Sequence, residues 1–287
     1  MTTATKRVRS VLSALVSFIM SLLITGGVLC TTLYMTALND DFAVSVVERS
    51  QYAELLSAEI KDEFISYGHA SNIEDTFFDS LFENTVTPQR ISTDTEQILR
   101  DFYAGSVQDS VPTDDLEAVL FEDLKEYAIQ RGFEPDDEMV ENLQIVASEL
   151  CEVYNSYVSV FSMSYFRTAS RMLSNYSPYA LYAAVICAVG FVVTAVILRL
   201  FYRKAKNYLR YYIYAFSGAA LMLLAAPLAA LIGNIGGKIN IASAALYSIA
   251  SGMLSSVFVA MAVSAAIPIL CTVLLSVLWF VANRKDK

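Results

Sequence analysis

Long apolar runs alternate with amphipathic segments along this chain. Val11–Leu38 and Pro178–Leu198 contain no charged residue, and neither does Tyr211–Gly237. A fourth apolar run ends at Asn283, just before a basic C-terminus. At ~1.5 Å per residue, a helix of ~20 residues crosses a hydrocarbon core of ~30 Å. The pattern therefore predicts four membrane-spanning helices.

The first apolar run has a second interpretation, which is a cleaved signal peptide. Such a peptide has an apolar core of only about 7–15 residues and a small-x-small cleavage site. Val11–Leu38 is far longer than that, and Met35-Thr36-Ala37 is a poor cleavage site. We therefore interpret the run as an uncleaved membrane span.

A different pattern governs residues 39–177, between the first and second runs. Apolar side chains recur there at steps of three and four, which is typical of amphipathic helices. The first such set is Val44, Val47, Tyr52, Leu55, Leu56, Ile60, Phe64 and Ile65. It predicts one helix, with Gly68 as its C-terminal cap.

Start and stop signals mark the later helices of this stretch. The start signals are Ser71-x-x-Glu74, Thr93-x-x-Glu96, Pro112–Asp115 and Pro135–Glu138. The first two have the form of capping boxes, and the last two place proline and acids where helices begin. Gly105 and Gly132 are expected to end helices. We expect the first and last helices of the stretch to extend the first and second membrane spans.

Charge is distributed unevenly along the chain. Residues 39–177 contain 28 of the 29 acidic residues and 8 of the 20 basic residues, a net charge of −20, and the remainder carries +11. Ten of the other twelve basic residues cluster in Lys6–Arg9, Arg203–Arg210 and Arg284–Lys287, and Arg199 and Lys238 are the remaining two. The positive-inside rule places these clusters and both termini in the cytoplasm, and residues 39–177 outside. The predicted fold class is all-α: a four-helix transmembrane bundle with an acidic helical extracellular domain inserted between the first and second spans.

The expected segments follow in chain order. They are a cytoplasmic N-terminus (1–10), a first span (11–38), the extracellular acidic domain (39–177), a second span (178–200), a cytoplasmic basic loop (201–210), a third span (211–232), an extracellular turn with a short helix at 239–253 (233–254), a fourth span (255–282) and a cytoplasmic C-terminus (283–287).

Composition limits the partners and the cellular location. A domain of net charge −20 repels polyanions, so we expect no nucleic acid partner. Cys30, Cys187 and Cys271 lie in apolar runs and Cys151 lies in the acidic stretch, so no disulfide can form within that stretch. Secreted eukaryotic domains of this size usually carry paired cysteines. We therefore expect the plasma membrane of a bacterium.

The residues that could carry chemistry favour structural roles. His69 is the only histidine, which leaves no Ser-His-Asp or Cys-His pair within the chain, and we expect it in a solvated loop. Asp114-Asp115 and Asp136-Asp137-Glu138 lack the spacing of a calcium loop and are expected to stabilise helix N-termini, although an attraction for cations or basic partners stays open. Cys151 is predicted to be a buried thiol rather than part of an intermolecular disulfide. The sequence thus assigns no catalytic residue, no cofactor and no metal.

Several features concern the spans themselves. Pro227 and Pro268 are expected to kink the third and fourth spans, for a gate or only for packing, and Gly26-Gly27 is expected to loosen the first. Small residues such as Gly218 let helices approach closely in lipid. Arg199 lies at the end of the second span, and no other Asp, Glu, Lys, Arg or His lies inside any span, which argues against a proton-coupled transporter that acts alone.

These patterns favour a non-enzymatic integral membrane protein whose extracellular helical domain binds a protein or envelope partner, in an accessory, scaffold or sensing role. The expected partners are the lipid bilayer and either another protein or a second copy of the chain, through the outer domain or the spans. The loop Arg203–Arg210 either docks a cytoplasmic protein or an anionic lipid, or only sets the topology.

The alternative is a subunit of a transporter or channel, with the outer domain as a gate or coupling lever. One span, a large outer domain and three more spans resemble the topology of the permease subunits of mechanotransmitting ABC transporters. Those permeases have a mixed α/β outer domain and a longer cytoplasmic coupling segment, and this sequence shows neither.

Overall fold

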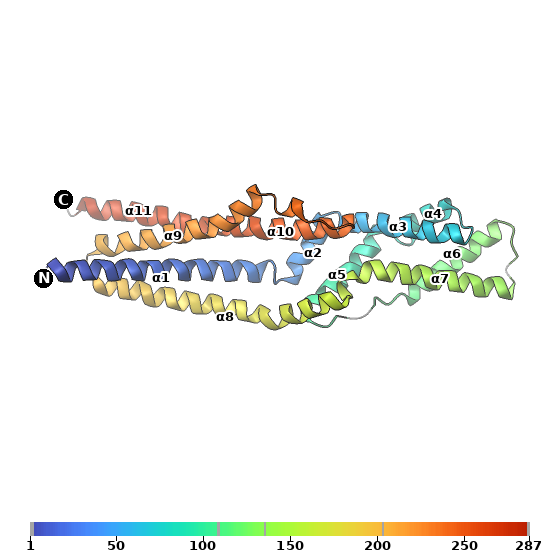
Figure 1. Ribbon diagram of the computed structural model, residues 1–287, viewed down its shortest axis with the longest axis horizontal. Helices are drawn as coiled ribbons and strands as arrows, with labels where there is room; N and C mark the ends of the chain where they lie inside the picture. The colour runs from blue at the N-terminus through green and yellow to red at the C-terminus, as the bar shows by residue number, and fades with distance from the viewer. Residues whose placement is uncertain (1–2, 108–109, 135, 203, 286–287) are drawn as a thin grey trace. The chain divides into compact units, whose positions relative to one another are not determined.

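The computed structural model describes residues 3–107, 110–134, 136–202 and 204–285. Over these residues the fold is all-helical and contains no strand. The elements are α1 (Thr3–Met35), α2 (Asp40–Arg49), α3 (Tyr52–Ala70), α4 (Asp75–Asn84), α5 (Pro88–Ala104), α6 (Asp114–Gln130), α7 (Asp137–Val158), η1 (Ser159–Ser162), α8 (Ser164–Phe201), α9 (Ala205–Ile232), η2 (Gly236–Lys238), α10 (Ala244–Ser264) and α11 (Ala266–Lys285) (Figure 1). The all-α prediction is confirmed. Pro135 and Arg203, which belong to two predicted signals, lie outside the described residues, as do Asp286 and Lys287.

The chain divides into two compact units. We call residues 1–39, 176–238 and 253–287 the membrane unit, and residues 40–175 and 239–252 the acidic unit. The division falls inside α8 and inside α10. Four helical segments of the described chain are long and apolar enough to cross a bilayer: α1, α8, α9 and the pair α10–α11. The chain is therefore a multi-pass membrane protein.

Small side chains form the interior of the membrane unit, where α9 packs against α1 and α11 (Figure 1). Met20 on α1, Leu198 on α8 and Ala215 on α9 make a buried cluster. Ala219 on α9 is also fully buried. Because lipid tails are as apolar as leucine, helices associate in a bilayer through close packing of small residues rather than through burial of large ones.

A ridge of serines on α1 faces α9. Ser13, Ser17 and Ser21 follow one another at steps of four and are all buried. The Ser17 hydroxyl donates a hydrogen bond of 2.7 Å to the carbonyl oxygen of Tyr211 on α9. Small size and a hydroxyl that satisfies a carbonyl across the interface suit these serines to helix contact in lipid.

The expectation that Gly26-Gly27 loosens the first span is wrong, because α1 continues through both residues. A Cβ added at Gly26 would lie 3.3 Å from the Cys187 sulfur on α8, and one at Gly27 would lie 3.3 Å from the Cβ of Cys187. The two glycines therefore allow α1 and α8 to approach closely.

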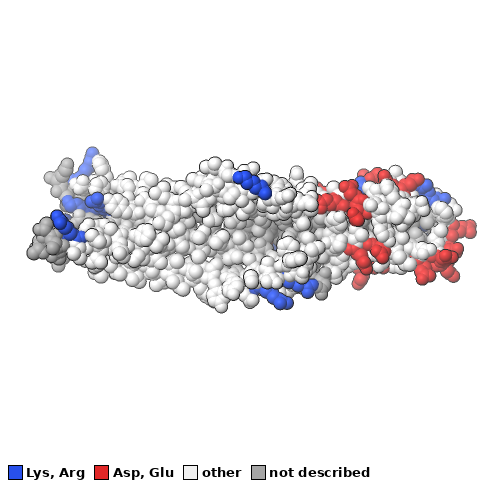
Figure 2. Space-filling model, viewed as in Figure 1, with Lys and Arg blue, Asp and Glu red and all other residues white. Residues whose placement is uncertain are grey.

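The outer surface of the membrane unit is apolar. Large side chains such as Leu200, Leu221 and Ile186 are 77%, 71% and 68% exposed. Figure 2 shows a broad stretch of this surface, next to its basic end, that is almost free of charged side chains. An exposed apolar surface of this extent is suited to contact with lipid rather than water.

Large apolar side chains form the core of the acidic unit. Tyr52, Ile60 and Phe64 on α3 are fully buried, and so are Phe78 on α4 and Tyr154 on α7. Buried leucines and isoleucines of the other helices complete this core: Ile91, Leu99, Leu116, Leu120, Leu124 and Leu150. The ring centroids of Phe64 and Phe78 lie 6.3 Å apart in an edge-to-face arrangement, which is favourable for aromatic pairs.

The predicted first helix of this stretch is divided in two. α2 ends at Arg49, and Gln51 adopts a left-handed conformation with φ of 55° before α3 begins. The Ser50 hydroxyl donates to the carbonyl oxygen of Val47, and such a bond competes with the regular helical pattern. The predicted extension of the first span is also wrong, since α1 ends at Met35 and turns separate it from α2.

Gly68 does not end α3, contrary to the prediction. It is buried inside the helix, and a Cβ at this position would overlap the ring of Phe78. α3 continues to Ala70, and Asn72 takes the left-handed conformation (φ 56°) that ends it. The glycine is needed for packing, while asparagine provides the turn.

The two predicted capping boxes are wrong as well. Ser71 lies at the C-terminal end of α3. Thr93 lies in the interior of α5, whose N-cap is Thr87, with its side chain accepting from the backbone of Arg90. Proline after the cap is a stronger start signal here than the box, because its φ is already helical and it lacks an N–H.

Other predicted signals are confirmed. Gly105 (φ 76°) ends α5, and Gly132 (φ 84°) follows α6. Asp136 caps α7, with its carboxylate accepting from the backbone N–H of Met139 at 2.8 Å. Thr113 is the N-cap of α6, as the segment before Asp114 predicts.

Segment 239–252 belongs to the acidic unit, which the sequence did not indicate. Its contact point is Glu59 on α3, whose carboxylate accepts from the Ser243 hydroxyl at 2.8 Å and from the backbone N–H of Ala245 at 3.0 Å. Glu59 thereby caps the N-terminus of α10, where a negative charge is favourable. The Ser248 hydroxyl also bonds to the carbonyl oxygen of Ser50.

Prolines of the spans act differently from one another. Pro178, expected in the first turn of the second span, lies inside α8, which begins at Ser164. Pro227 lies inside α9 without interrupting it. The predicted kink at Pro268 is found as a break at Ala265 between α10 and α11, because a proline ring clashes with the carbonyl four residues earlier. The predicted short helix at 239–253 is accordingly replaced by the longer α10.

Candidate functional site

The acidic clusters singled out in the sequence lie at helix starts. Asp114 and Asp115 occupy the first turn of α6, and Asp137 and Glu138 the first turn of α7. At these positions the carboxylates face the positive end of the helix dipole. Their predicted structural role is confirmed.

Cys151 has the environment predicted for it, and His69 has it in part. His69 is exposed as predicted, but it lies in the last turn of α3 and not in a loop, and its Nε2 is 2.6 Å from the carboxylate of Asp75. Cys151 is 3% exposed, and burial raises the pKa of its thiol to about 12. A thiol with so high a pKa is neutral at physiological pH and thus a poor nucleophile.

A partly buried polar network joins α5, α6 and α7. Arg90 donates to Asp115 at 2.8 Å, and the Tyr154 hydroxyl donates to Asp94 at 2.5 Å. Burial raises the pKa of Asp115, but its hydrogen bond to Arg90 and the charge of that guanidinium outweigh burial and lower it. Burial and then the bond to Asp94 raise the pKa of Tyr154 far above its ordinary value. The network thus links three helices of the acidic unit.

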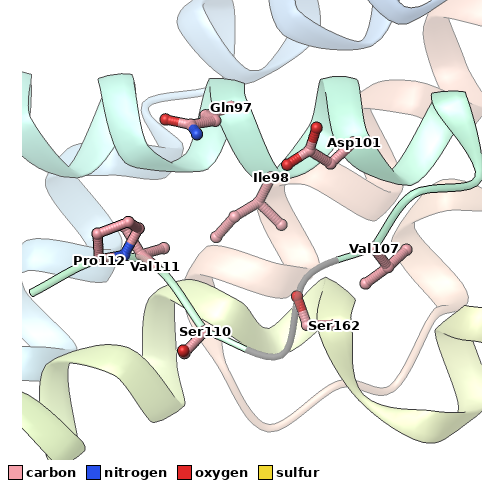
Figure 3. A pocket seen from close by; sticks show the side chains of 8 residues that line it. All are labelled: Gln97, Ile98, Asp101, Val107, Ser110, Val111, Pro112 and Ser162. Carbon is pink, nitrogen blue, oxygen red and sulfur yellow. The ribbon is translucent and has the colours of Figure 1, made fainter.

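A small cavity lies between α5 and the chain that follows it (Figure 3). Ile98 points into it from α5, opposite Val107 and Val111. Its volume is about 10 Å³, which is room for at most one water molecule. We therefore do not assign it a ligand.

A larger groove lies between α4 and α6, and we call it the acidic groove. Its volume is about 510 Å³, within the range of ligand sites. The lining residues are Glu74, Thr76, Phe77, Ser80, Leu81, Asn84, Thr85, Asp123, Glu126, Tyr127, Gln130 and Arg131. Three of them are carboxylates and one is a guanidinium, so the groove is negatively charged.

One end of the acidic groove is held closed by contacts among its own residues. Arg131 pairs with Glu74 and lies 5.3 Å from the centre of the Tyr127 ring. The Tyr127 hydroxyl accepts from the backbone N–H of Glu74 at 3.2 Å, and its ring centroid lies 5.0 Å from that of Phe77. Glu74 is therefore neutralised by its neighbour, and Asp123 and Glu126 supply the charge of the groove.

Asp123 has the most unusual environment of the groove residues. Burial raises its pKa, a hydrogen bond from the Thr85 hydroxyl at 3.2 Å lowers it, and the negative charge of Glu126 raises it, for a net upward shift. An acid held in an environment that disfavours its charge gains when a cation binds nearby.

The sequence reasoning missed this groove, although a signal exists. Asp123, Glu126, Tyr127 and Gln130 recur at steps of three and four, so they share one face of α6. That face could be recognised from the sequence. Its position opposite α4, which gives the groove its second wall, could not.

The basic segments of the membrane unit meet at a second cavity, of about 410 Å³. We call it the basic cavity, and its lining residues are Arg9, Tyr202, Lys206, Asn207, Arg210, Tyr211, Trp279 and Asn283. Residues from the N-terminal segment, the predicted basic loop and the C-terminal segment thus come together. Figure 2 shows the same end of the membrane unit as a group of basic side chains.

Within the described ranges no group of histidine, cysteine and carboxylate side chains has the arrangement of a metal site. Comparisons with known protein families, with curated proteins and with solved structures find no match to this chain.

Proposed function

We propose that this protein is a non-enzymatic integral membrane protein whose acidic unit binds a positively charged segment of a partner in the acidic groove. The observation that carries the proposal is the groove of about 510 Å³ between α4 and α6, which Asp123 and Glu126 line together. Burial and the charge of Glu126 raise the pKa of Asp123 there. Such an environment costs free energy in the unbound protein, and a lysine or arginine side chain placed between the two carboxylates recovers it.

The remaining lining of the groove fits a peptide. Phe77 and Tyr127 supply aromatic surface for an apolar side chain. Ser80 and Asn84 supply hydrogen-bonding groups for a backbone. The lining is otherwise mainly polar, which suits a charged segment that can form hydrogen bonds.

We further propose that the acidic unit is extracellular, that both termini are cytoplasmic, and that the membrane is a bacterial plasma membrane. The positive-inside rule supports this orientation, because Arg9 of the N-terminal segment and Lys206 and Arg210 of the predicted basic loop line one cavity. Glu141→Cys and Lys204→Cys variants should react oppositely with a membrane-impermeant maleimide in intact cells. Labelling of both positions, or of position 204 alone, would contradict the orientation.

The groove is tested by crosslinking in intact cells. A photoreactive residue at position 80, inside the groove, should yield one defined adduct. Asp123→Asn combined with Glu126→Gln should abolish the adduct, whereas Glu149→Gln combined with Glu152→Gln, which removes the same charge from α7, should leave it. An adduct of twice the chain mass would identify the partner as a second copy. The proposal fails if position 80 gives no adduct or if both double variants behave alike.

A second candidate function is a transporter or channel subunit in which the acidic unit acts as a gate or lever. The supporting observation is that the division between the two units falls inside α8 and inside α10, so uninterrupted helices connect them. The break at Ala265 gives the last apolar segment a point of bending. Reconstituted protein that conducts no solute and copurifies with no ATPase would remove this candidate.

A further inference from the structure

We propose that the basic cavity binds the phosphate-bearing headgroup of an anionic phospholipid. Its volume of about 410 Å³ lies within the range of small-molecule sites. Arg9, Lys206 and Arg210 line it together, from two different helices. The site is separate from the acidic groove, and neither proposal depends on the other.

The charge of the cavity is the first argument. The membrane unit contains one acidic residue in its whole sequence, Asp286, which lies outside the described residues. Among the described residues, Arg9 and Arg210 therefore face a cavity lined by no carboxylate. A phosphate group supplies the negative charge that these lining residues do not provide.

The second argument is that Arg9 is held in position. Its guanidinium carbon lies 4.7 Å from the centre of the Tyr202 ring. That ring stacks on Tyr211 with centroids 5.6 Å apart, and the Ser13 hydroxyl donates to the Tyr202 hydroxyl at 3.2 Å. A cation positioned in advance loses less entropy when an anion binds.

The start of α9 provides a third feature. Lys204 is its N-cap and makes no capping hydrogen bond with its side chain, while the backbone N–H of Asn207 donates to the Lys204 carbonyl oxygen at 3.1 Å. The positive end of the helix dipole favours an anion beside Lys206 and Asn207. Trp279 joins α11 to this turn by donating to the Lys206 carbonyl oxygen at 3.1 Å.

Two observations favour a lipid over free phosphate. The cavity lies at the ends of helices long enough to cross a bilayer, and it contains Trp279 and two tyrosines, the residues typical of the headgroup region. Close to it in sequence, Leu200 on α8 and Val277 on α11 are 77% and 57% exposed. These faces are suited to the acyl chains of the same lipid molecule.

Trp279 makes the test specific, because it is the only tryptophan and it lines the cavity. The full chain in a neutral detergent is titrated with phosphatidylglycerol, with phosphatidylcholine and with inorganic phosphate, while Trp279 emission is followed. We expect saturable binding of phosphatidylglycerol alone. Arg9→Gln combined with Arg210→Gln should weaken it about tenfold or more.

Lys204→Gln combined with Arg284→Gln is the matched control, because it removes two charges from the same end outside the cavity. Its affinity should stay within about twofold of the wild type. Asn207→Asp places a carboxylate in the cavity without removing a packing group, and it should also weaken binding of phosphatidylglycerol. This variant tests the proposal if the double arginine variant does not fold. Equal weakening in both double variants, equal binding of phosphatidylcholine, or an equal response to inorganic phosphate would overturn the proposal.

Discussion

The two units are built from the same element, the α-helix, yet they bury opposite kinds of side chain. In the acidic unit Phe64 and Tyr154 are 0% exposed. In the membrane unit Ser13 and Ala215 are 0% exposed, while Leu200 is 77% exposed. Water drives large apolar side chains into a core, whereas lipid offers them an equally apolar environment outside. The kind of side chain buried inside a helical unit thus depends on whether the unit is suited to water or to lipid.

The charges follow the same division. The acidic unit has a net charge of −20 and places many of its carboxylates at helix starts and on the surface, as Figure 2 shows for one face. The membrane unit has almost no carboxylate, and three of its cations, Arg9, Lys206 and Arg210, line one cavity at one end. Solvation is the common cause. A charged side chain is well solvated in water, whereas placing it at the centre of a bilayer costs about 3 kcal/mol or more.

The largest expected effect comes from truncating a buried apolar side chain, compared with truncating an exposed one. Phe64→Ala should destabilise the acidic unit by about 3–5 kcal/mol, because it leaves a cavity among aromatic rings. Leu200→Ala should change the stability of the membrane unit by less than about 0.5 kcal/mol, because its side chain is exposed. Hydrogen exchange of α3 and of α8 in the full chain measures the two effects. Comparable losses would contradict the contrast between the units.

Next in size is the capping of α10 by Glu59. Glu59→Ala should cost about 2–3 kcal/mol, because it removes a charged acceptor from the Ser243 hydroxyl and the Ala245 N–H. Trypsin should then cleave faster after Lys238, since segment 239–252 is no longer held. Glu59→Gln keeps one acceptor oxygen, so its cleavage rate should lie between those of the wild type and of Glu59→Ala.

Glu63→Ala is the control for that experiment. It removes an exposed acid one turn further along α3, so its cleavage rate should equal that of the wild type. If Glu63→Ala and Glu59→Ala accelerated cleavage equally, a loss of negative charge rather than the loss of the cap would be the cause.

A smaller effect is expected where small residues meet in the membrane unit. A Cβ at Gly218 would lie 2.8 Å from the Ser21 hydroxyl oxygen, so Gly218→Ala should destabilise the packing of α9 on α1 by about 1–2 kcal/mol. Adding Ser21→Ala removes that oxygen and should restore most of the stability. Thermal unfolding in detergent measures both variants. The packing argument is wrong if the double variant is no more stable than the single one.

The smallest effect concerns Asp123. Its pKa is raised in the folded protein, so the ionised carboxylate destabilises the fold above that pKa, and the penalty disappears as pH falls through it. Asp123→Asn should therefore stabilise the acidic unit slightly at pH 7, by less than about 1 kcal/mol because the group is partly solvated. The difference should vanish in acid. Melting curves at pH 7 and below pH ~4 check it, and a loss of stability at pH 7 would contradict the stated cause.

Sequence patterns identified the helices better than their ends. The three- and four-residue steps correctly place Tyr52, Ile60 and Phe64 in a core. Gly68 was assigned as a helix end because glycine usually caps, whereas here it makes room for Phe78. The ring that fills this space belongs to α4, and the residues next to Gly68 in the sequence do not indicate its presence.

The candidate sites show the same limit. The spacing of Asp123, Glu126 and Tyr127 indicates one polar face of α6, and the basic clusters indicate one end of the membrane unit. Neither pattern indicates a cavity. The acidic groove needs α4 as its second wall, and the basic cavity needs residues of three segments that are far apart in the chain.

The sequence by itself determined that the chain is helical, that it has four segments suited to a bilayer, and that its acids and bases are separated. Those properties follow from local periodicity and from the solvation of each side chain, which act within a few residues. Only the tertiary structure decided that segment 239–252 joins the acidic unit through Glu59, that serines of α1 face α9, and which carboxylates share a groove. These outcomes depend on shape complementarity between helices distant in sequence, and that complementarity exists only once the chain has folded.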